Sequence, residues 1–312
     1  MKWFLCTLTV FFQFIFFYGQ DSLVLLKNFN YSKADSIALN FPKKKFNSFT
    51  EIAFPLCENL NTDHEKFRAI FRWITDNVEY NKSASNVADA DKIVRKNKAV
   101  CQGFSNLLKE MCNSVGIECE TIIGFTKTDI KDIGKKLTKT DHAWNAVQLY
   151  GRWYLVDVTW ATSKFNVVTR KFEKNFDAHY FLCYPELFIL DHLPKEKKWQ
   201  LLDKKMKPHR FSSLPLFYAD YFHLKLDQIT PEKGRISVKL DKKLKISYRS
   251  NIPIKNATYQ LNTERYAFPA EISTDSTDNR STFFASFTKK GHFVFSIFLN
   301  NVIVAEYLLR VK

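Results

Sequence analysis

The hydrophobic residues of this chain change their period along its length, and this change limits the folds that the chain can adopt. Between Thr62 and Gly116 apolar residues recur at helical spacing, and Thr62 with Glu65 forms a capping-box pattern at the start. Short alternating runs typical of strands follow over residues 118–159, and more come after about Tyr221. This order predicts an α+β domain followed by an all-β sandwich.

The length of 312 residues is enough for two ordinary domains, each with a core of its own. We expect an extended, partly ordered lead-in over residues 20–45, an α+β domain over 46–214 and a β-sandwich over 215–312. The α+β domain should contain helices near 62–78, 88–96 and 101–116, and strands near 118–125, 143–150 and 153–159.

Residues 1–19 have the pattern of a secretory signal peptide. The run from Trp3 to Tyr18 is apolar apart from two threonines and one glutamine, and it is shorter than the ~20 residues of a membrane span. An uncleaved anchor is the alternative, because Phe17 is a poor residue at its place before the cleavage point. No later stretch is apolar enough for a transmembrane segment, so we expect a secreted, periplasmic or cell-envelope protein.

The net charge of +15 comes from lysines and arginines spread over the whole chain. No stretch interleaves basic and aromatic residues as a nucleic-acid module does, so we expect no nucleic-acid partner. The charge indicates either a solvated surface or attraction to an acidic cell-envelope surface.

Five cysteines remain after the leader, an odd number, so at least one thiol has no partner within the chain. No Cys or His cluster has zinc-site spacing, and we expect no metal. For Cys57, Cys112, Cys119 and Cys183 we expect buried packing thiols or one disulfide.

Cys101 differs from these because it opens an amphipathic helix, whose apolar stripe begins at Phe104 and stops at Gly116. A thiol at a helix N-terminus meets the positive end of the dipole and backbone N–H groups, which favour the reactive thiolate. The alternative is an inert thiol packed in a core.

A second group with chemical potential lies on a predicted hairpin over residues 141–161, with Gly151 in its turn. If Leu149 faces Arg152, the register places His142 diagonally beside Asp157 on one face of the sheet. A register shifted by one residue separates them. A carboxylate beside an imidazole is the arrangement that a base serving a cysteine nucleophile needs.

Three blocks carry a family resemblance: VCQGFSNLLKEMCNSVGIECETIIGF, DHAWNAVQLYGRWYLVDVTW and YFLCYPELFILDHLPKEKKWQLL. They resemble the transglutaminase-like superfamily, with its papain-like cysteine fold, and within it the kyphoscoliosis peptidase branch with its bacterial exported members. The resemblance implies Cys101 as nucleophile, His142 as general base and acid, and Asp157 as the residue that orients His142. It also implies an immunoglobulin-like C-terminal domain and no cofactor. The candidate substrate-site residues are Gln102, Trp144, Trp73 and Tyr80.

The resemblance leaves two classes of function open. The first is a cysteine enzyme that acts on protein or peptide amides through an acyl-enzyme, as a peptidase, an amidase or an acyl transferase. The second is a binding or scaffold protein that keeps the fold, with the β domain as its interaction module.

The segment from Thr126 to Thr140 is long for a connection and holds five lysines against Asp129 and Asp132. It indicates either a basic lid that favours acidic substrates or a mobile solvated loop.

Overall fold

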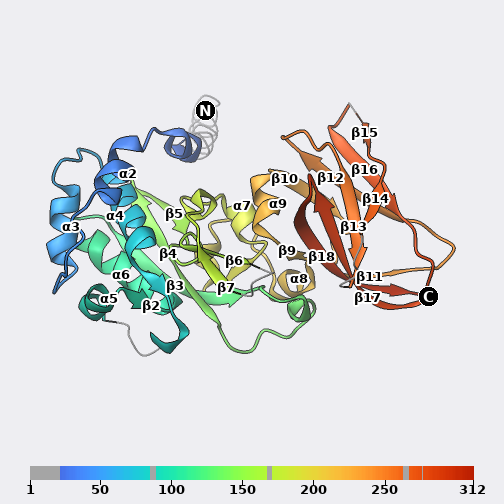
Figure 1. Ribbon diagram of the computed structural model, residues 1–312, viewed down its shortest axis with the longest axis horizontal. Coiled ribbons are helices and arrows are strands. Elements are labelled where there is room, and N and C mark those ends of the chain that lie inside the picture. The colour runs from blue at the N-terminus through green and yellow to red at the C-terminus, as the bar shows by residue number, and fades with distance from the viewer. Residues whose placement is uncertain (1–21, 85–88, 167–170, 263–266, 276) are drawn as a thin grey trace, which may run out of the picture. The chain divides into compact units, whose positions relative to one another are not determined.

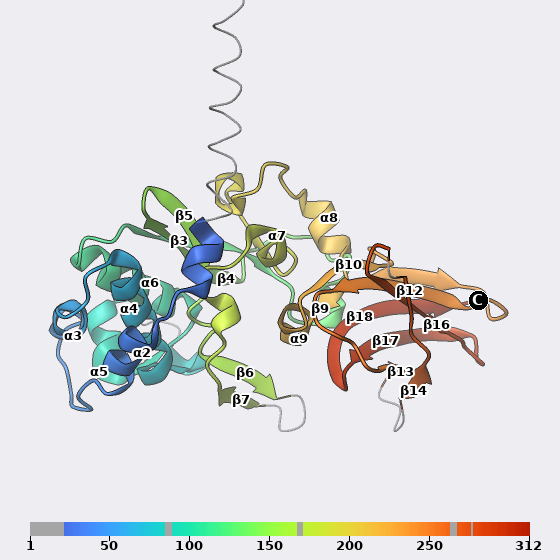
Figure 2. The same cartoon turned by 90° about the horizontal axis from the view of Figure 1, so that it is seen from above.

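The computed structural model describes residues 22–84, 89–166, 171–262, 267–275 and 277–312 (Figures 1 and 2). The predicted signal peptide over residues 1–19 lies outside them. The chain divides into two compact units. The first holds the described residues as far as Ile123 together with His142–Pro185, and the second holds Gly124–Asp141 and Glu186–Lys312. This division differs from the single boundary expected near residue 215, because two segments before that point cluster with the C-terminal strands.

The helices predicted near residues 62–78, 88–96 and 101–116 form in the first unit, whereas the lead-in and residues 50–57 are helical where no helix was predicted. Residues 22–28 and the following α2 are helical rather than extended, and their buried residues, among them Leu23 with Leu26 and Ala34 with Ala38, recur at helical spacing. The capping box forms as expected, with the backbone N–H of Thr62 donating to Glu65 over 3.3 Å. The helices are α2 (Ser32–Leu39), α3 (Thr50–Cys57), α4 (Asp63–Asn77), α5 (Ala90–Lys96) and α6 (Cys101–Ser114).

A sheet with the strand order β5-β4-β3-β8 holds the predicted strands. β4 and β5 form the expected hairpin, and the last residues of β3 pair with β8 in the second unit. The strands are β3 (Cys119–Thr126), β4 (His142–Leu149), β5 (Arg152–Val156) and β8 (His192–Pro194), with the short pairs β1 (Glu79–Tyr80) and β2 (Lys98–Ala99), and β6 (Ser163–Asn166) and β7 (Lys171–Lys174).

Helix α6 packs on this sheet through its apolar stripe. Phe104, Leu107 and Met111 on the stripe are fully buried, as the spacing predicts. Asn145 of β4 adds a polar clamp, because its side-chain amide donates to the carbonyl of Ser105 on α6 over 2.9 Å and to that of Glu120 on β3 over 3.2 Å. The helix that starts at Cys101 is therefore fixed against the strand that starts at His142.

The second unit contains two sheets with a common core. Their strand orders are β10-β12-β16-β15 and β11-β18-β17-β13-β14, and buried residues of both, such as Tyr248 and Phe295, belong to one hydrophobic cluster. Figure 1 shows these strands in orange to red. Their bounds are β10 (Leu226–Thr230), β11 (Arg235–Val238), β12 (Leu244–Ser250), β13 (Ala257–Leu261), β14 (Phe268–Ala270), β15 (Ser273–Asp275), β16 (Arg280–Ala285), β17 (Gly291–Leu299) and β18 (Val302–Val311).

Among the described residues, every helix is too short or too polar to span a membrane. Short elements complete the second unit. These elements are α7 (Pro185–Phe188), which starts at the end of the first unit, α8 (Pro208–Ser213), β9 (Leu216–Phe217) and α9 (Ala219–His223).

The lysine-rich loop over residues 126–140 is packed against its own unit rather than solvated along its length. The Lys127 ammonium is buried and donates to the carbonyls of Phe211 and Leu214 over 2.7 and 2.9 Å. Ile133 is fully buried, and the backbone N–H of Gly134 donates to Ser212 over 2.8 Å. These contacts fix the loop at two points, and its role as a lid stays a prediction.

Candidate active site

Cys101 is the first residue of α6, as the sequence predicts. Val100 before it is extended and provides no side-chain cap, and the first backbone bond of the helix runs from Phe104 N–H to Val100 carbonyl over 3.0 Å. The N–H groups of residues 101–103 therefore have no acceptor within the helix. The thiol of Cys101 is half-buried and lies beside the positive end of the helix dipole.

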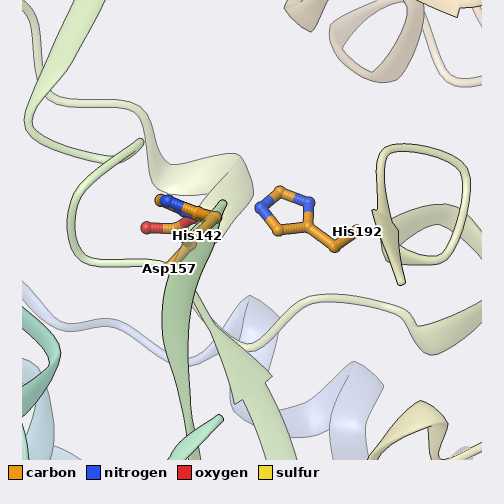
Figure 3. Close-up of side chains that lie close together, drawn as sticks. All are labelled: His142, Asp157 and His192. Carbon is orange, nitrogen blue, oxygen red and sulfur yellow. The ribbon is translucent and has the colours of Figure 1, made fainter. Parts of the chain in front are cut away.

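The register of the β4–β5 hairpin brings His142 and Asp157 together. Leu149 pairs with Arg152 and Asn145 with Val156, which is the register that places both side chains on one face. The Nε2 atom of His142 lies 2.6 Å from Oδ2 of Asp157, and Figure 3 shows the two side chains in contact. Figure 3 also labels His192, which belongs to the second unit and is hydrogen-bonded to its neighbour Asp191.

Asp157 is fixed by its backbone surroundings as well as by His142. Its side chain is fully buried, and Oδ1 accepts the N–H groups of Thr159 and Trp160 over 2.8 and 2.9 Å. These bonds leave Oδ2 for the imidazole. Because Nε2 of His142 is held by Asp157, Nδ1 is the ring nitrogen that is left for the Cys101 thiol.

The thiol of Cys101 is hydrogen-bonded to His142, and its electrostatic environment favours the thiolate. Burial acts to raise its pKa and is the largest single effect, but the hydrogen bond and charge of His142 and the backbone N–H of Ala143 together outweigh burial. The net effect lowers the pKa of Cys101 below its ordinary value of 9.0.

The pKa of His142 is shifted upwards, in the opposite direction to that of Cys101. Burial acts to lower its pKa, but the charge and hydrogen bond of Asp157, with a further contribution from Cys101, raise the pKa of His142 to about 10. A lowered thiol pKa and a raised imidazole pKa favour a thiolate–imidazolium pair over a neutral thiol and imidazole. The two groups titrate together, so their protons belong to the pair.

Aromatic rings surround the imidazole of His142. The ring of Trp160 lies 5.6 Å from it and the ring of Trp144 lies 6.0 Å away, measured between ring centroids. Trp144 is fully buried, so it forms a wall behind His142, whereas Trp160 is half-exposed and also contacts the ring of Tyr180.

The four candidate substrate-site residues lie in different places. Tyr80 lies near the thiol, since burial and then the charge of Cys101 raise its pKa, and Trp144 packs beside His142. Gln102 is in the first turn of α6, where its side chain donates to Asn106 over 2.8 Å. Trp73 lies on α4, where its side chain is buried and contacts the ring of Phe41. None of these contacts involves Cys101, His142 or Asp157.

Sequence reasoning missed three contributors. Trp160 follows Asp157 by three residues, and the tight turn that caps the carboxylate brings its ring to His142. Asn145 is three residues after His142, and its signal in the sequence was a polar residue between the apolar residues Trp144 and Ala146. The N–H of Ala143 contributes through the backbone, which no side-chain pattern reveals.

All five cysteines among the described residues are free thiols. Cys57, Cys112, Cys119 and Cys183 are buried, which agrees with packing thiols rather than a disulfide. His142 is hydrogen-bonded to Asp157 through one ring nitrogen and is also hydrogen-bonded to the Cys101 thiol, an arrangement that suits proton transfer.

Comparison with known proteins places this site in a family context. Residues 50–158 match the model of the transglutaminase-like superfamily. Kyphoscoliosis peptidase of Homo sapiens is 34% identical over 192 residues, which cover 60% of this chain and 29% of that protein. The protein of the same name from Mus musculus is 32% identical over 229 residues, which cover 72% of this chain and 34% of that protein.

Hillarin of Drosophila melanogaster is 26% identical over 311 residues, which cover 89% of this chain and 37% of that protein. The chain thus spans about a third of the length of these curated relatives. The family match includes Cys101, His142 and Asp157, and residues 50–158 therefore form a transglutaminase-like core.

Proposed function

We propose that this protein is a cysteine enzyme that cleaves amide bonds of peptides or proteins through an acyl-enzyme on Cys101. The observation that supports this most is the hydrogen-bonded chain from Cys101 through His142 to Asp157 at the start of a helix. This chain favours a thiolate beside an imidazolium, the form that a cysteine nucleophile needs. Similarity to proteins named kyphoscoliosis peptidase favours peptide bonds as the substrate.

In the first half-reaction, the Cys101 thiolate bonds to the carbonyl carbon, and the carbonyl π electrons move to the oxygen. The N–H groups of Cys101 and Gln102 in the first turn of α6 are the donors proposed for this oxyanion. His142 gives its proton to the amine as the carbon–nitrogen bond breaks, which leaves a thioester on Cys101. Asp157 holds the imidazolium in place and offsets its charge.

In the second half-reaction, water attacks the thioester while His142 takes one of its protons. The carbon–sulfur bond then breaks, and the thiolate returns. We propose water rather than an amine as this second nucleophile, because the similar proteins from two mammals are named as peptidases. An amine in the place of water would transfer the acyl group instead, by the same steps.

We also propose where the enzyme works and what its second unit is. The apolar run from Trp3 to Tyr18 supports export to the cell envelope or beyond. Two mainly antiparallel sheets that share one core support an immunoglobulin-like sandwich for the C-terminal strands.

The experiment compares the wild type with Cys101→Ala, using Cys112→Ala as a matched control on the same helix. Each protein is incubated with a peptide library, with and without a primary amine, and new peptide termini and amine adducts are counted by mass spectrometry. We expect new termini with the wild type and Cys112→Ala and none with Cys101→Ala. Amine adducts without new termini would replace the peptidase by an acyl transferase. Equal results for all three proteins would favour a scaffold.

A further inference from the structure

The outer face of the β11–β18–β17 sheet has a basic hollow of about 500 Å³ in the second unit. Its charged side chains are Arg235 of β11, Arg310 of β18 and Lys312, and His292 of β17 adds an imidazole. No aspartate or glutamate lines it among the described residues. The side chains that line the hollow therefore concentrate positive charge here.

The pairing of the strands makes this arrangement specific. Arg310 lies directly opposite His292 on one side and Ser237 on the other, and Arg235 is its diagonal neighbour. The guanidinium of Arg235 donates through Nε and Nη2 to the carbonyl of Ile133 over 3.2 and 2.8 Å, which holds this group in position. Within the described part of the chain, Arg310 has no ion-pair partner.

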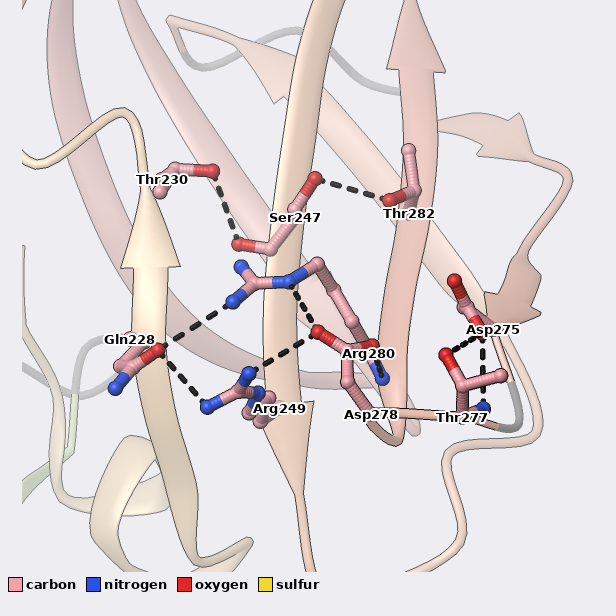
Figure 4. Close-up of polar contacts among 9 residues, drawn as sticks. All are labelled: Gln228, Thr230, Ser247, Arg249, Asp275, Thr277, Asp278, Arg280 and Thr282. Carbon is pink, nitrogen blue, oxygen red and sulfur yellow. Dashed lines mark hydrogen bonds and ion pairs between the residues drawn. The ribbon is translucent and has the colours of Figure 1, made fainter.

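The other sheet of the same unit shows how the chain compensates neighbouring arginines elsewhere. Arg249 and Arg280 lie directly opposite each other, but Asp278 accepts from both over 3.0 and 3.1 Å, and Gln228 accepts from Arg249 over 3.1 Å (Figure 4). Like charges that face each other across strands are destabilising unless an opposite charge lies between them. At Arg310 this opposite charge is absent from the described residues, and a ligand can supply it.

The pattern along the strands indicates the kind of ligand. The pair Val294 and Leu308 lies two residues from the pair His292 and Arg310, on the same outer face. Two residues of a strand span about 7 Å, which is also the distance between same-side residues of an extended peptide. An extended segment with an acidic residue two positions from an apolar one matches both pairs at once.

We propose that this hollow binds an extended acidic peptide segment, with a carboxylate on Arg310 and Arg235 and an apolar side chain over Leu308 and Val294. Arginine binds carboxylates through paired hydrogen bonds, which fixes orientation as well as affinity. The half-buried apolar floor distinguishes this site from one for bare phosphate. The proposal does not depend on the enzymatic activity of the first unit.

The test uses the full chain with Cys101→Ala, so that no probe is cleaved, and measures binding by fluorescence anisotropy. The probe is a labelled peptide with Glu and Val at alternate same-side positions, and its controls carry Gln for Glu or Ser for Val. We expect Arg310→Gln to weaken binding about tenfold or more, as the loss of a charge-assisted bond implies. Each control peptide should also bind more weakly than the probe.

Arg280→Gln removes the same charge from the other sheet and should change affinity less than twofold, with melting temperatures recorded for both variants. Equal weakening by both substitutions would show that only net charge attracts the peptide and would overturn the proposal. Absence of binding by the parent chain, or displacement of the peptide by inorganic phosphate at equal concentration, would overturn it as well.

Discussion

Replacement of Asp157 by Asn tests how the charge of one buried carboxylate controls the thiol of Cys101. The variant keeps the side-chain shape, and its amide oxygen can still accept the N–H groups of Thr159 and Trp160. It removes the negative charge that lies 2.6 Å from His142. The fold should therefore persist while the proton distribution of the pair changes.

The size of the effect follows from the environment of His142. Its pKa stands near 10 instead of the ordinary 6.5, although burial pushes it down, because Asp157 and Cys101 push it up. Without the charge of Asp157, burial should prevail, and the pKa of His142 should fall below 6.5. A fall from about 10 to below 6.5 changes the ratio of ion pair to neutral pair by at least roughly 3,000-fold, or about 5 kcal/mol.

The assay is the rate of iodoacetamide alkylation of Cys101 as a function of pH, with the labelled residue identified by mass spectrometry. The other four thiols of the described residues are at most 5% exposed, so labelling should concentrate on Cys101 when the protein is folded. In the wild type, labelling should be fast at neutral pH. In Asp157→Asn it should be slow there and rise only towards the ordinary thiol pKa.

Asp89→Asn is the matched control, because Asp89 caps α5 and asparagine is an equally good cap. It should leave the labelling profile unchanged. An unchanged profile in Asp157→Asn, with Cys101 still labelled fast at neutral pH, would refute the argument that Asp157 maintains the ion pair.

Further predictions concern the supports of the site and its pH range. Asn145→Ala removes both bonds of the clamp between α6 and the sheet; it should lower the melting temperature and also slow Cys101 labelling at neutral pH, and a drop in stability alone would contradict a positioning role. Cys112→Ala should cost about 1–2 kcal/mol of stability, measured by urea unfolding, while labelling of Cys101 stays unchanged. Turnover should rise with pH as Cys101 loses its proton and fall above about pH 10 as His142 loses its own, and a rate that keeps rising past that point would exclude His142 as the acid. If the loop over residues 126–140 selects substrates, replacement of its four other lysines by serine, with the buried Lys127 kept, should reduce kcat/KM for an acidic peptide relative to a neutral one at low salt. No difference between the two peptides would mean that the loop is only a connector. The four lysines are Lys131, Lys135, Lys136 and Lys139.

The sequence was most informative where a periodic pattern also fixes a register. The apolar stripe of α6 placed Cys101 at the helix start, and the tight turn at Gly151 allowed the register that joins His142 to Asp157. Both inferences rest on local geometry, which spacing determines.

Other features depend on contacts between distant segments, and the spacing of residues along the sequence does not predict such contacts. The lead-in is helical because its apolar residues find a core that other helices supply. The loop over residues 126–140 belongs to the second unit because Lys127 reaches the carbonyls of Phe211 and Leu214, more than 80 residues away in the chain. Trp73 was predicted as a substrate-site residue, but its side chain is buried in the core. Its position in the sequence of α4 did not show which way the side chain points.

The central claim is that His142 stabilises the thiolate of Cys101 and so lowers its pKa. The thiolate can be measured without knowledge of the substrate. The measurement is the ultraviolet absorbance of the thiolate as pH rises, taken as the difference between the wild type and Cys101→Ser, and repeated in the His142→Ala background. The account predicts that the wild-type thiolate appears well below the ordinary thiol pKa of 9.0 and that this early titration is lost without His142. A thiolate that appears only near 9.0 in the wild type, or at the same pH in both backgrounds, would contradict the account.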